Sequence, residues 1–334
     1  MSAGPAPMKR TLRDAATLLG GQLVGDDHPY GAVATDSRTL QPGALFVALR
    51  GPNFDGRGFV AAAAARGAIG ALVERAVPDD DLPQVVVPDA LRALQQLGQT
   101  WRSQFSLALV GVAGSNGKTT AKEMTAAILS RMGLCMATHG NLNNHIGVPV
   151  TLMRLENSHR SAVVEMGANR IGDVAELMRL ARPTVGLITN AGAEHLEGFG
   201  NLDGVAEGEG EMVSCLDPTA TAVINADDAY AGYWRKVATA RRILTFGVHA
   251  PADFMAKDSE QSIERGEFAT RFTLECPLGR RAIALKTGGA HNISNALAAA
   301  AAASAAGASL EEIALGLADF RAVAGRLQLK PGAR

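Results

Sequence analysis

A short apolar run followed at once by glycines and a lysine constrains this chain more than any other feature. Leu107–Val112 is wholly apolar, Gly111–Thr120 is rich in glycine, and Thr119–Met132 has a helical pattern. Strand, glycine-rich turn and helix in this order are typical of a phosphate-binding loop, because glycines let backbone N–H groups gather around phosphate oxygens at a helix N-terminus. The pattern predicts an α/β fold built on a parallel sheet.

The polar residues of this loop have distinct predicted roles. Lys118 is placed to reach the terminal phosphates of ATP, and the hydroxyl of Thr119 is placed to bind Mg²⁺. Val112 stands where the standard motif has its first glycine, which leaves Gly111 and Gly114 as substitutes. The alternative is a glycine-rich turn with a chance Lys-Thr pair, and the strand–loop–helix context favours ATP. The predicted ATP-binding residues here are Gly114, Ser115, Asn116, Gly117, Lys118, Thr119 and Thr120.

The chain of 334 residues is long enough for two domains. We predict a small N-terminal α/β domain over residues 9–90, a linker helix over 91–106 and a central domain over 107–330. In the central domain strand signals alternate with helical ones, which favours a mostly parallel sheet flanked by helices. The segment Asp253–Leu285 alternates in polarity and predicts added antiparallel strands.

Charge and cysteine content exclude several classes of function. A formal net charge of -1 gives no electrostatic case for nucleic acid or an anionic membrane as partner. Three scattered cysteines argue against a disulfide framework or a zinc site and fit a reducing compartment. The first residues do not form a secretory signal, and the alanine run Ala296–Ala306 predicts a buried helix rather than a membrane span. We therefore expect a cytoplasmic protein without stable membrane insertion. We also expect a monomer, although no sequence feature sets the oligomeric state.

Polar residues follow two of the predicted strands. Glu165 ends an apolar run, and His195 lies in the loop after the strand Thr184–Thr189. Ligands of parallel sheets bind at the carboxyl ends of strands, and Mg²⁺ prefers oxygen ligands, so both residues are candidates for a metal site. The alternatives are an exposed strand-end acid for Glu165 and a surface residue for His195.

Four further polar residues have a functional and a structural interpretation. Asn141 and Asn144 belong to an amide-rich segment that suits a sugar or peptide substrate, or forms an ordinary turn. Asn295 is placed to reach a base, whereas the preceding Asn292 has the sequence position of an N-cap. Arg326 suits a phosphate, a ribose or a surface ion pair. From the residues alone, a structural role is favoured for Asn292, Asn295 and Arg326.

Taken together, these segments resemble the Mur ligases from about Thr11 to Leu327. Gly114–Thr120 resembles the family's phosphate loop. GNLNNHIGVP, EMGAN and HLEGFGNLDGVAEGEGE resemble the branch that adds D-alanyl-D-alanine to UDP-N-acetylmuramoyl-tripeptide. Three segments resemble the family's N-terminal domain, which holds uridine diphosphate. They are Thr35–Arg38, Gly43–Ala48 and Asp55-Gly56.

The resemblance implies an ATP-dependent ligase with those two substrates and two Mg²⁺ ions. A carboxylate is activated as an acyl phosphate and then forms an amide. By the same resemblance, the catalytic residues would be Lys118, His195 and Glu165. By residue, the implied contacts are Lys118 with the phosphates, Thr119 and Glu165 with the first Mg²⁺, His195 with the second, Asn295 with adenine, Arg326 with the nucleotide, Ser37 and Arg38 with the uridine end, and Asn141 and Asn144 with the muramoyl-peptide.

Two departures from the family pattern stand out. Many Mur ligases have a carbamylated lysine where this chain has Glu209, and our hypothesis is that Glu209 supplies the same anionic charge for the second Mg²⁺. The alternative for Glu209 is an acidic, solvated helix end. The family's C-terminal domain, which binds D-alanyl-D-alanine, is absent from these 334 residues, so we expect little ligation by this chain alone. A sibling ligase with another amino-acid substrate and a non-catalytic nucleotide-binding fragment remain as alternatives.

Overall fold

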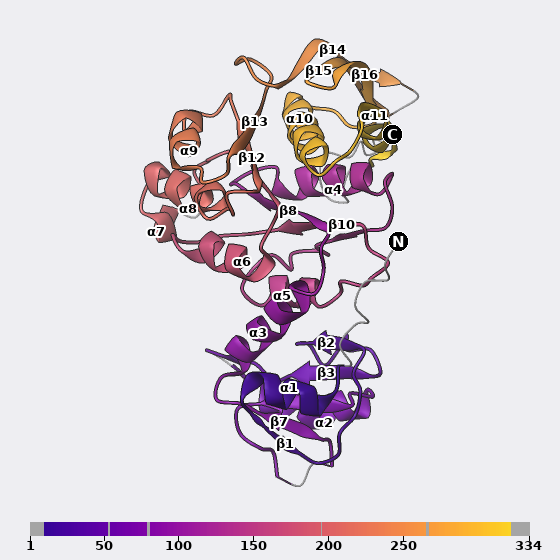
Figure 1. The fold of residues 1–334 in the computed structure, drawn as a ribbon, viewed down its shortest axis with the longest axis vertical. Helices are drawn as coiled ribbons and strands as arrows, with labels where there is room; N and C mark the ends of the chain where they lie inside the picture. Colours follow the sequence, from indigo (N-terminus) through magenta and orange to yellow (C-terminus); the bar gives the residue numbers. More distant parts are fainter. Residues whose placement is uncertain (1–9, 53, 79–80, 195, 265–266, 322–334) are drawn as a thin grey trace, which may run out of the picture. The chain divides into compact units, whose positions relative to one another are not determined.

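The structure is a computed structural model, and it describes residues 10–321 apart from 53, 79–80, 195 and 265–266 (Figure 1). The predicted positions His195 and Arg326 lie outside the described residues. The chain divides into two compact units. The first comprises residues 1–106 and 145–157, and the second comprises 107–144 and 158–334.

The first unit is built on a five-stranded sheet. Only β1 is antiparallel to its neighbour, and the other pairs are parallel. The order of strands is β1 (Gln22–Val24), β7 (Gln84–Val86), β6 (Gly70–Val73), β3 (Ala44–Val47) and β2 (Ala32–Ala34). A two-stranded ribbon, β4 (Arg50–Gly51) with β5 (Phe54–Asp55), precedes a 3₁₀ turn, η1 (Gly56–Phe59). The helices are α1 (Leu12–Leu19), α2 (Val60–Ala65), α3 (Ala90–Arg102) and α5 (Gly147–Leu152).

Helix α3 is part of this first unit rather than a separate linker. Asp89 caps it by accepting from the backbone N–H of Arg92 at 2.9 Å, and its apolar face is buried against α1 and α5. Gly98 makes the contact with α5 close, since a Cβ there would lie 2.8 Å from the Cα of Pro149. The structure therefore assigns both 91–106 and 145–157 to the first unit. The sequence had predicted a linker helix and an uninterrupted second domain.

The second unit contains a nine-stranded sheet whose strands run parallel from β9 to β14. β15 and β16 extend it with antiparallel pairing, as the alternating pattern predicted. Its order is β16 (Gly279–Leu285), β15 (Glu267–Cys276), β14 (Phe254–Glu264), β13 (Arg242–Gly247), β12 (Thr221–Asn225), β11 (Val185–Ile188), β8 (Ala108–Ala113), β10 (Ser161–Glu165) and β9 (Cys135–Ala137). The α/β class with a mostly parallel sheet flanked by helices is confirmed.

Helices lie on both sides of strand β8 (Figure 1), and its residues pack alternately against the two sides. Val110 and Val112 pack in the core formed with α4 (Lys118–Leu129), α10 (Ala290–Ala305) and α11 (Leu310–Asp319). Gly111 faces the other way, and a Cβ there would lie 3.2 Å from the Cε of Met212 in α8 (Leu202–Ser214). Helix α6 (Asp173–Ala181) packs beside α8 on that second face, and two short helices, α7 (Leu196–Phe199) and α9 (Ala231–Val237), contact α8.

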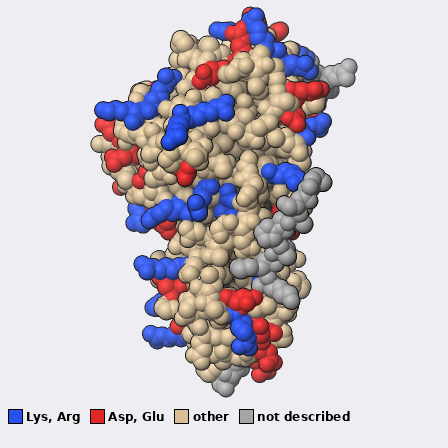
Figure 2. All heavy atoms as spheres, in the orientation of Figure 1, with Lys and Arg blue, Asp and Glu red and all other residues tan. Residues whose placement is uncertain are grey.

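The alanine run predicted as a buried helix forms most of α10. Residues Ala296–Ala303 each have an exposed fraction of 1% or less, because small side chains let this helix pack closely on α4 and the sheet. Among the described residues, no helix is both long and apolar enough to cross a bilayer. On the face drawn in Figure 2, basic and acidic side chains are interspersed.

Candidate nucleotide and metal site

The loop after β8 has the backbone geometry that its glycines predict. Gly114 has φ +121° and Gly117 has φ +83°, which are conformations that side chains with a Cβ rarely adopt. A Cβ on Gly114 would lie 2.2 Å from Oγ1 of Thr189, and one on Gly117 would lie 2.4 Å from Oδ1 of Asn295. Since Gly111 lies inside β8, Gly114 is the first glycine of the loop proper.

The loop is fastened to the residues that follow β11. The backbone N–H of Ser115 donates to the carbonyl oxygen of Asn190 at 2.9 Å, and the N–H of Asn116 donates to Asn190 Oδ1 at 3.0 Å. The N–H of Gly192 donates to the hydroxyl of Ser115 at 2.8 Å. Thr189 completes the set through its hydroxyl, which donates to the carbonyl oxygen of Asn116 at 2.7 Å. These bonds fix the conformation of the loop.

Lys118 is held over the loop that precedes it. Its Nζ donates to the carbonyl oxygens of Gly114 and Ser115, the latter at 2.9 Å. The ammonium therefore lies at the N-terminus of α4, where the helix dipole also favours an anion. Thr119 and Thr120 follow in the first turn of α4 and are half-buried.

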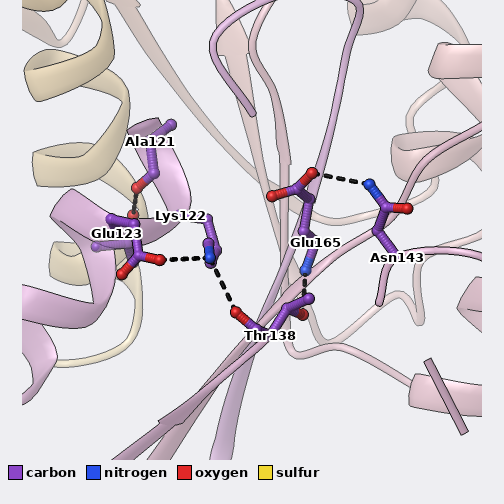
Figure 3. Close-up of polar contacts among 7 residues, drawn as sticks. Ala121, Lys122, Glu123, Thr138, Asn143 and Glu165 are labelled. Atoms are coloured by element: carbon purple, nitrogen blue, oxygen red, sulfur yellow. Dashed lines mark hydrogen bonds and ion pairs between the residues drawn. The ribbon is translucent and has the colours of Figure 1, made fainter. Parts of the chain in front are cut away.

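Glu165 lies at the carboxyl end of β10, the parallel neighbour of β8 (Figure 3). The residue is 3% exposed, and its Oε1 accepts a hydrogen bond from Nδ2 of Asn143 at 2.9 Å. Its Oε2 is buried and has no hydrogen-bond partner among the described residues. A buried carboxylate oxygen without a partner is costly, and a hard cation would satisfy it. The alternative of an exposed strand-end acid is wrong.

The described part of the predicted metal site, which excludes His195, contains no closed cage of protein ligands. Within the described part of the chain, no group of three or more His, Cys, Asp or Glu side chains is arranged to hold a metal ion. Mg²⁺ does not need such a cage, because it keeps several waters and takes one or two protein ligands together with substrate phosphates. Glu165 and the nearby loop fit a site of that kind.

Asn292 and Asn295 lie in the first turns of α10 and are both buried. The N-cap of α10 is Gly289, so the N-cap position predicted for Asn292 is wrong. Asn292 instead donates to the carbonyl oxygen of Gly288 at 2.7 Å, and its Oδ1 accepts from Asn295 Nδ2 at 3.3 Å. The side chain of Asn295 closely approaches Gly117, which brings α10 to the phosphate loop.

Glu209 lies beneath the phosphate loop rather than at a solvated helix end. It is 3% exposed within α8, and its Oε2 accepts from the backbone N–H of Gly114 at 2.7 Å. Burial raises the pKa of Glu209 to about 7, although Lys118 and the Gly114 N–H oppose the rise. Its neighbours differ, since Glu207 is exposed and Glu211 accepts from the N–H groups of Gly172 and Ala175.

The remaining predicted substrate residues have simpler surroundings. In the first unit, Ser37 is buried, whereas Arg38 is exposed and pairs with Asp36 at 2.8 Å. In the second unit, Asn141 and Asn144 are exposed. The amide that reaches Glu165 is Asn143, which the prediction passed over. The three amides lie within four consecutive residues, so only the course of the backbone distinguishes them.

Known proteins match nearly the whole chain. The Mur ligase middle domain matches residues 112–303, and the catalytic domain of the Mur ligase family matches residues 29–102. UDP-N-acetylmuramoyl-tripeptide–D-alanyl-D-alanine ligase of Escherichia coli (strain K12) is 45% identical over 318 residues, covering 95% of this chain and 69% of that protein. This chain belongs to the Mur ligase family.

Other relatives of this Mur ligase chain have the same name or are solved structures of MurF. The ligase of the same name from Haemophilus influenzae is 37% identical and is matched over 68% of its length. The structure of MurF from Acinetobacter baumannii has a TM-score of 0.89 at 35% identity, over 98% of this chain and 72% of that one. MurF from Thermotoga maritima, solved in complex with ADP, has a TM-score of 0.76 at 28% identity, over 90% of this chain and 68% of that one. The resemblance inferred from the motifs is confirmed.

Replacing Glu209 by glutamine is expected to change how stability depends on pH. Because the folded state holds the Glu209 proton up to about pH 7, the wild type loses stability as pH rises from the unfolded pKa near 4.5 through 7. The loss is at most about 3 kcal/mol, and the variant lacks it. Urea unfolding between about pH 5 and pH 8, with metal removed, measures this. The exposed Glu207→Gln is the control, and parallel profiles for Glu209→Gln and wild type would contradict the burial argument.

Proposed function

We propose that this chain is the part of an ATP-dependent ligase that binds ATP and UDP-N-acetylmuramoyl-tripeptide, and that the ligase joins the tripeptide to D-alanyl-D-alanine in peptidoglycan precursor synthesis. The observation that carries this proposal is 45% identity to the E. coli ligase of that name over 95% of the chain. The site supports it, because the loop, Lys118 and Glu165 meet the needs of phosphoryl transfer. We further propose that the protein works in the cytoplasm as a monomer.

The proposed reaction has two steps. An oxygen of the tripeptide's terminal carboxylate attacks the γ-phosphorus of ATP, and ADP leaves with its bonding electrons. The amine of D-alanyl-D-alanine then attacks the acyl carbon and loses a proton, and phosphate leaves. In the first step two anions approach each other, so the site must supply positive charge and N–H donors. Lys118 and the N-terminus of α4, which begins at Lys118, are placed to do so, with Ser115 and Asn116 holding the loop in shape.

Two Mg²⁺ ions are proposed to bind with ATP. When bound, Mg²⁺ neutralises phosphate charge and polarises the phosphoryl group. Thr119 and Glu165 would hold the first ion, which is supported by the buried Oε2 of Glu165, since this oxygen has no partner among the described residues. His195 would help to hold the second. Glu209, in its ionised form, fits as a nearby negative charge better than as a ligand, because its Oε2 already accepts from the N–H of Gly114.

The other predicted residues are proposed as binding residues. Asn295 would face adenine, with Asn292 supporting its amide through their hydrogen bond. Arg326 would bind the nucleotide. Ser37 and Arg38 would lie near the uridine end of the substrate, and Asn141 and Asn144 would contact the muramoyl-peptide. Asn143 holds Glu165 and is proposed to orient it.

Replacing Glu165 by glutamine is expected to raise the Mg²⁺ concentration needed for ADP binding by at least about 10-fold. Glutamine retains an oxygen for Asn143 but carries no charge for the ion. Fluorescence titration of an ADP analogue over a range of Mg²⁺ concentrations measures the shift. The exposed Glu311→Gln in α11 is the matched control. An unchanged Mg²⁺ requirement in Glu165→Gln would remove Glu165 from the metal site.

Calorimetric titration of the chain with uridine ligands tests the proposed substrate. We expect one molecule of UDP-N-acetylmuramoyl-tripeptide per chain, bound at least about 10-fold more tightly than UDP-N-acetylmuramic acid without peptide. Mg·ADP is expected to bind as well, at a separate site. Preference for a shorter peptide would indicate a sibling ligase. A folded chain that binds neither ligand would overturn the proposal.

A further inference from the structure

The helix that follows the phosphate loop contains a fully buried lysine with no role in the mechanism above. Lys122 has an exposed fraction of 0%, whereas the other buried residues of α4 are mostly apolar. Its Nζ donates to the carbonyl oxygen of Thr138 at 2.9 Å and pairs with Glu123 at 2.6 Å (Figure 3). Burying an ammonium is costly, and a well-packed apolar side chain often gives equal or greater stability. The contacts of Lys122 therefore suggest a role other than stability.

Thr138 connects this lysine to the proposed metal ligand. It follows β9 directly and is 2% exposed. Its N–H donates to the carbonyl oxygen of Val163 at 3.0 Å, and its hydroxyl oxygen accepts from the backbone N–H of Glu165 at 3.0 Å. Lys122 holds the carbonyl group of the same residue, so one threonine joins α4 to the end of β10.

The side chain of Glu165 is also held by the segment that Thr138 begins. Asn143, five residues later, donates to Glu165 Oε1, and its carbonyl oxygen accepts from the N–H of Gly167 at 2.8 Å. The carboxylate is thus fixed through its backbone by Thr138 and through Oε1 by Asn143 (Figure 3). Oε2 has no hydrogen-bond partner in the part of the chain that the structure describes. The position of Thr138 therefore bears on both contacts.

We propose that Lys122 is a positioning residue for the metal site. Through Thr138, Lys122 ties the helix carrying Lys118 and Thr119 to the strand end carrying Glu165. This link sets the separation of the two protein groups proposed to share one Mg²⁺ ion. The inference rests on the proposed function of Thr119 and Glu165. It adds the contacts that keep these two residues at a fixed separation. Small displacements of such outer contacts commonly weaken metal binding by about 10- to 100-fold.

Lys122→Met, which keeps the length of the side chain but removes its donors, tests this link. Binding of Mn²⁺, used in place of Mg²⁺, is measured by electron paramagnetic resonance in the presence of ADP, and ADP affinity is measured with metal removed. We expect Mn²⁺ affinity to fall by about 10-fold or more, while metal-free ADP affinity changes by less than about 2-fold. A role in packing alone would lower the melting temperature or weaken ADP equally with and without metal.

Variants at Thr138 test the same link if Lys122→Met does not fold. Thr138→Val removes the hydroxyl at similar volume and is expected to weaken Mn²⁺ binding, whereas Thr138→Ser keeps the hydroxyl and should stay within about 2-fold of wild type. If Lys122 acts through Thr138, the double variant Lys122→Met/Thr138→Val loses less than the sum of the single losses.

The outcomes separate this inference from the proposed function. A wild-type chain that binds no Mn²⁺ with ADP would refute the proposed metal site itself. A wild type that binds Mn²⁺, together with folded Lys122→Met and Thr138→Val variants that bind it equally well, would overturn only the role of Lys122.

Discussion

Replacing Lys118 by alanine is expected to weaken ADP and ATP binding by at least about 100-fold while leaving the fold intact. Lys118 provides the positive charge of the loop, and charge-assisted bonds to phosphate in a partly buried site are among the strongest polar contacts. The change also removes the two bonds from Nζ to the carbonyl oxygens of Gly114 and Ser115. Alanine favours the helical conformation of the first turn of α4, so we expect the fold to be retained.

Calorimetry or a fluorescent ADP analogue measures the Lys118→Ala affinity, and circular dichroism checks the melting temperature. Lys236→Ala is the matched control, since Lys236 is exposed on α9 and its replacement removes the same net charge. An ADP affinity within about 3-fold of wild type would mean that nucleotide does not bind at this loop.

Replacing Gly114 by alanine is expected to have the largest effect on stability. The new Cβ would lie 2.2 Å from Thr189 Oγ1 and 2.9 Å from the backbone nitrogen of Thr189. That nitrogen donates a 3.0 Å hydrogen bond to the carbonyl oxygen of Ala113, so moving it away from the new Cβ would break or lengthen this bond. Overpacking together with an unfavourable φ of +121° should cost about 3 kcal/mol or more and distort the loop so that ADP no longer binds.

Gly172→Ala separates backbone strain from the clash in this experiment. Gly172 also has a positive φ, +98°, but a Cβ there would have no atom within 4 Å. Its loss should be about 1–2 kcal/mol, with ADP binding unchanged. Urea unfolding compares the loss of stability in Gly114→Ala with that in Gly172→Ala. Equal losses would show that the clash with Thr189 adds nothing to the cost of the positive φ.

The central α/β architecture was predictable because local patterns carry it. An apolar strand, a glycine turn and a helix such as Leu107–Met132 have few other ways to pack. Domain boundaries were less predictable, since a helical pattern does not say which neighbour its apolar face meets. Helix α3 and the segment 145–157 both belong to the first unit, and the short distance between Gly98 and Pro149 reflects a contact between residues far apart in the sequence.

The same distinction holds within the site. The rule that ligands bind at strand ends selected Glu165, and its buried Oε2 agrees with that choice. Nothing local indicated that Glu209 would be buried, because an acid between glycines in a polar helix is usually solvated. Its burial depends on the packing of α8 against β8 and β11. The contact of Lys122 with Thr138 joins residues sixteen positions apart, and it likewise depends on tertiary structure.

Formation of UDP-N-acetylmuramoyl-pentapeptide is the measurement that tests the central claim most directly. Because the chain spans 69% of the E. coli relative, the assay uses the chain alone and the chain extended after Arg334 by the remaining part of that relative. With ATP, Mg²⁺, the tripeptide substrate and D-alanyl-D-alanine, we predict that the extended chain makes the product, detected by mass spectrometry, with one phosphate released per product. Omission of D-alanyl-D-alanine, or the change Lys118→Ala, should abolish it. An extended, folded chain that binds ATP but forms product only with another amino acid, or none at all, would contradict the account.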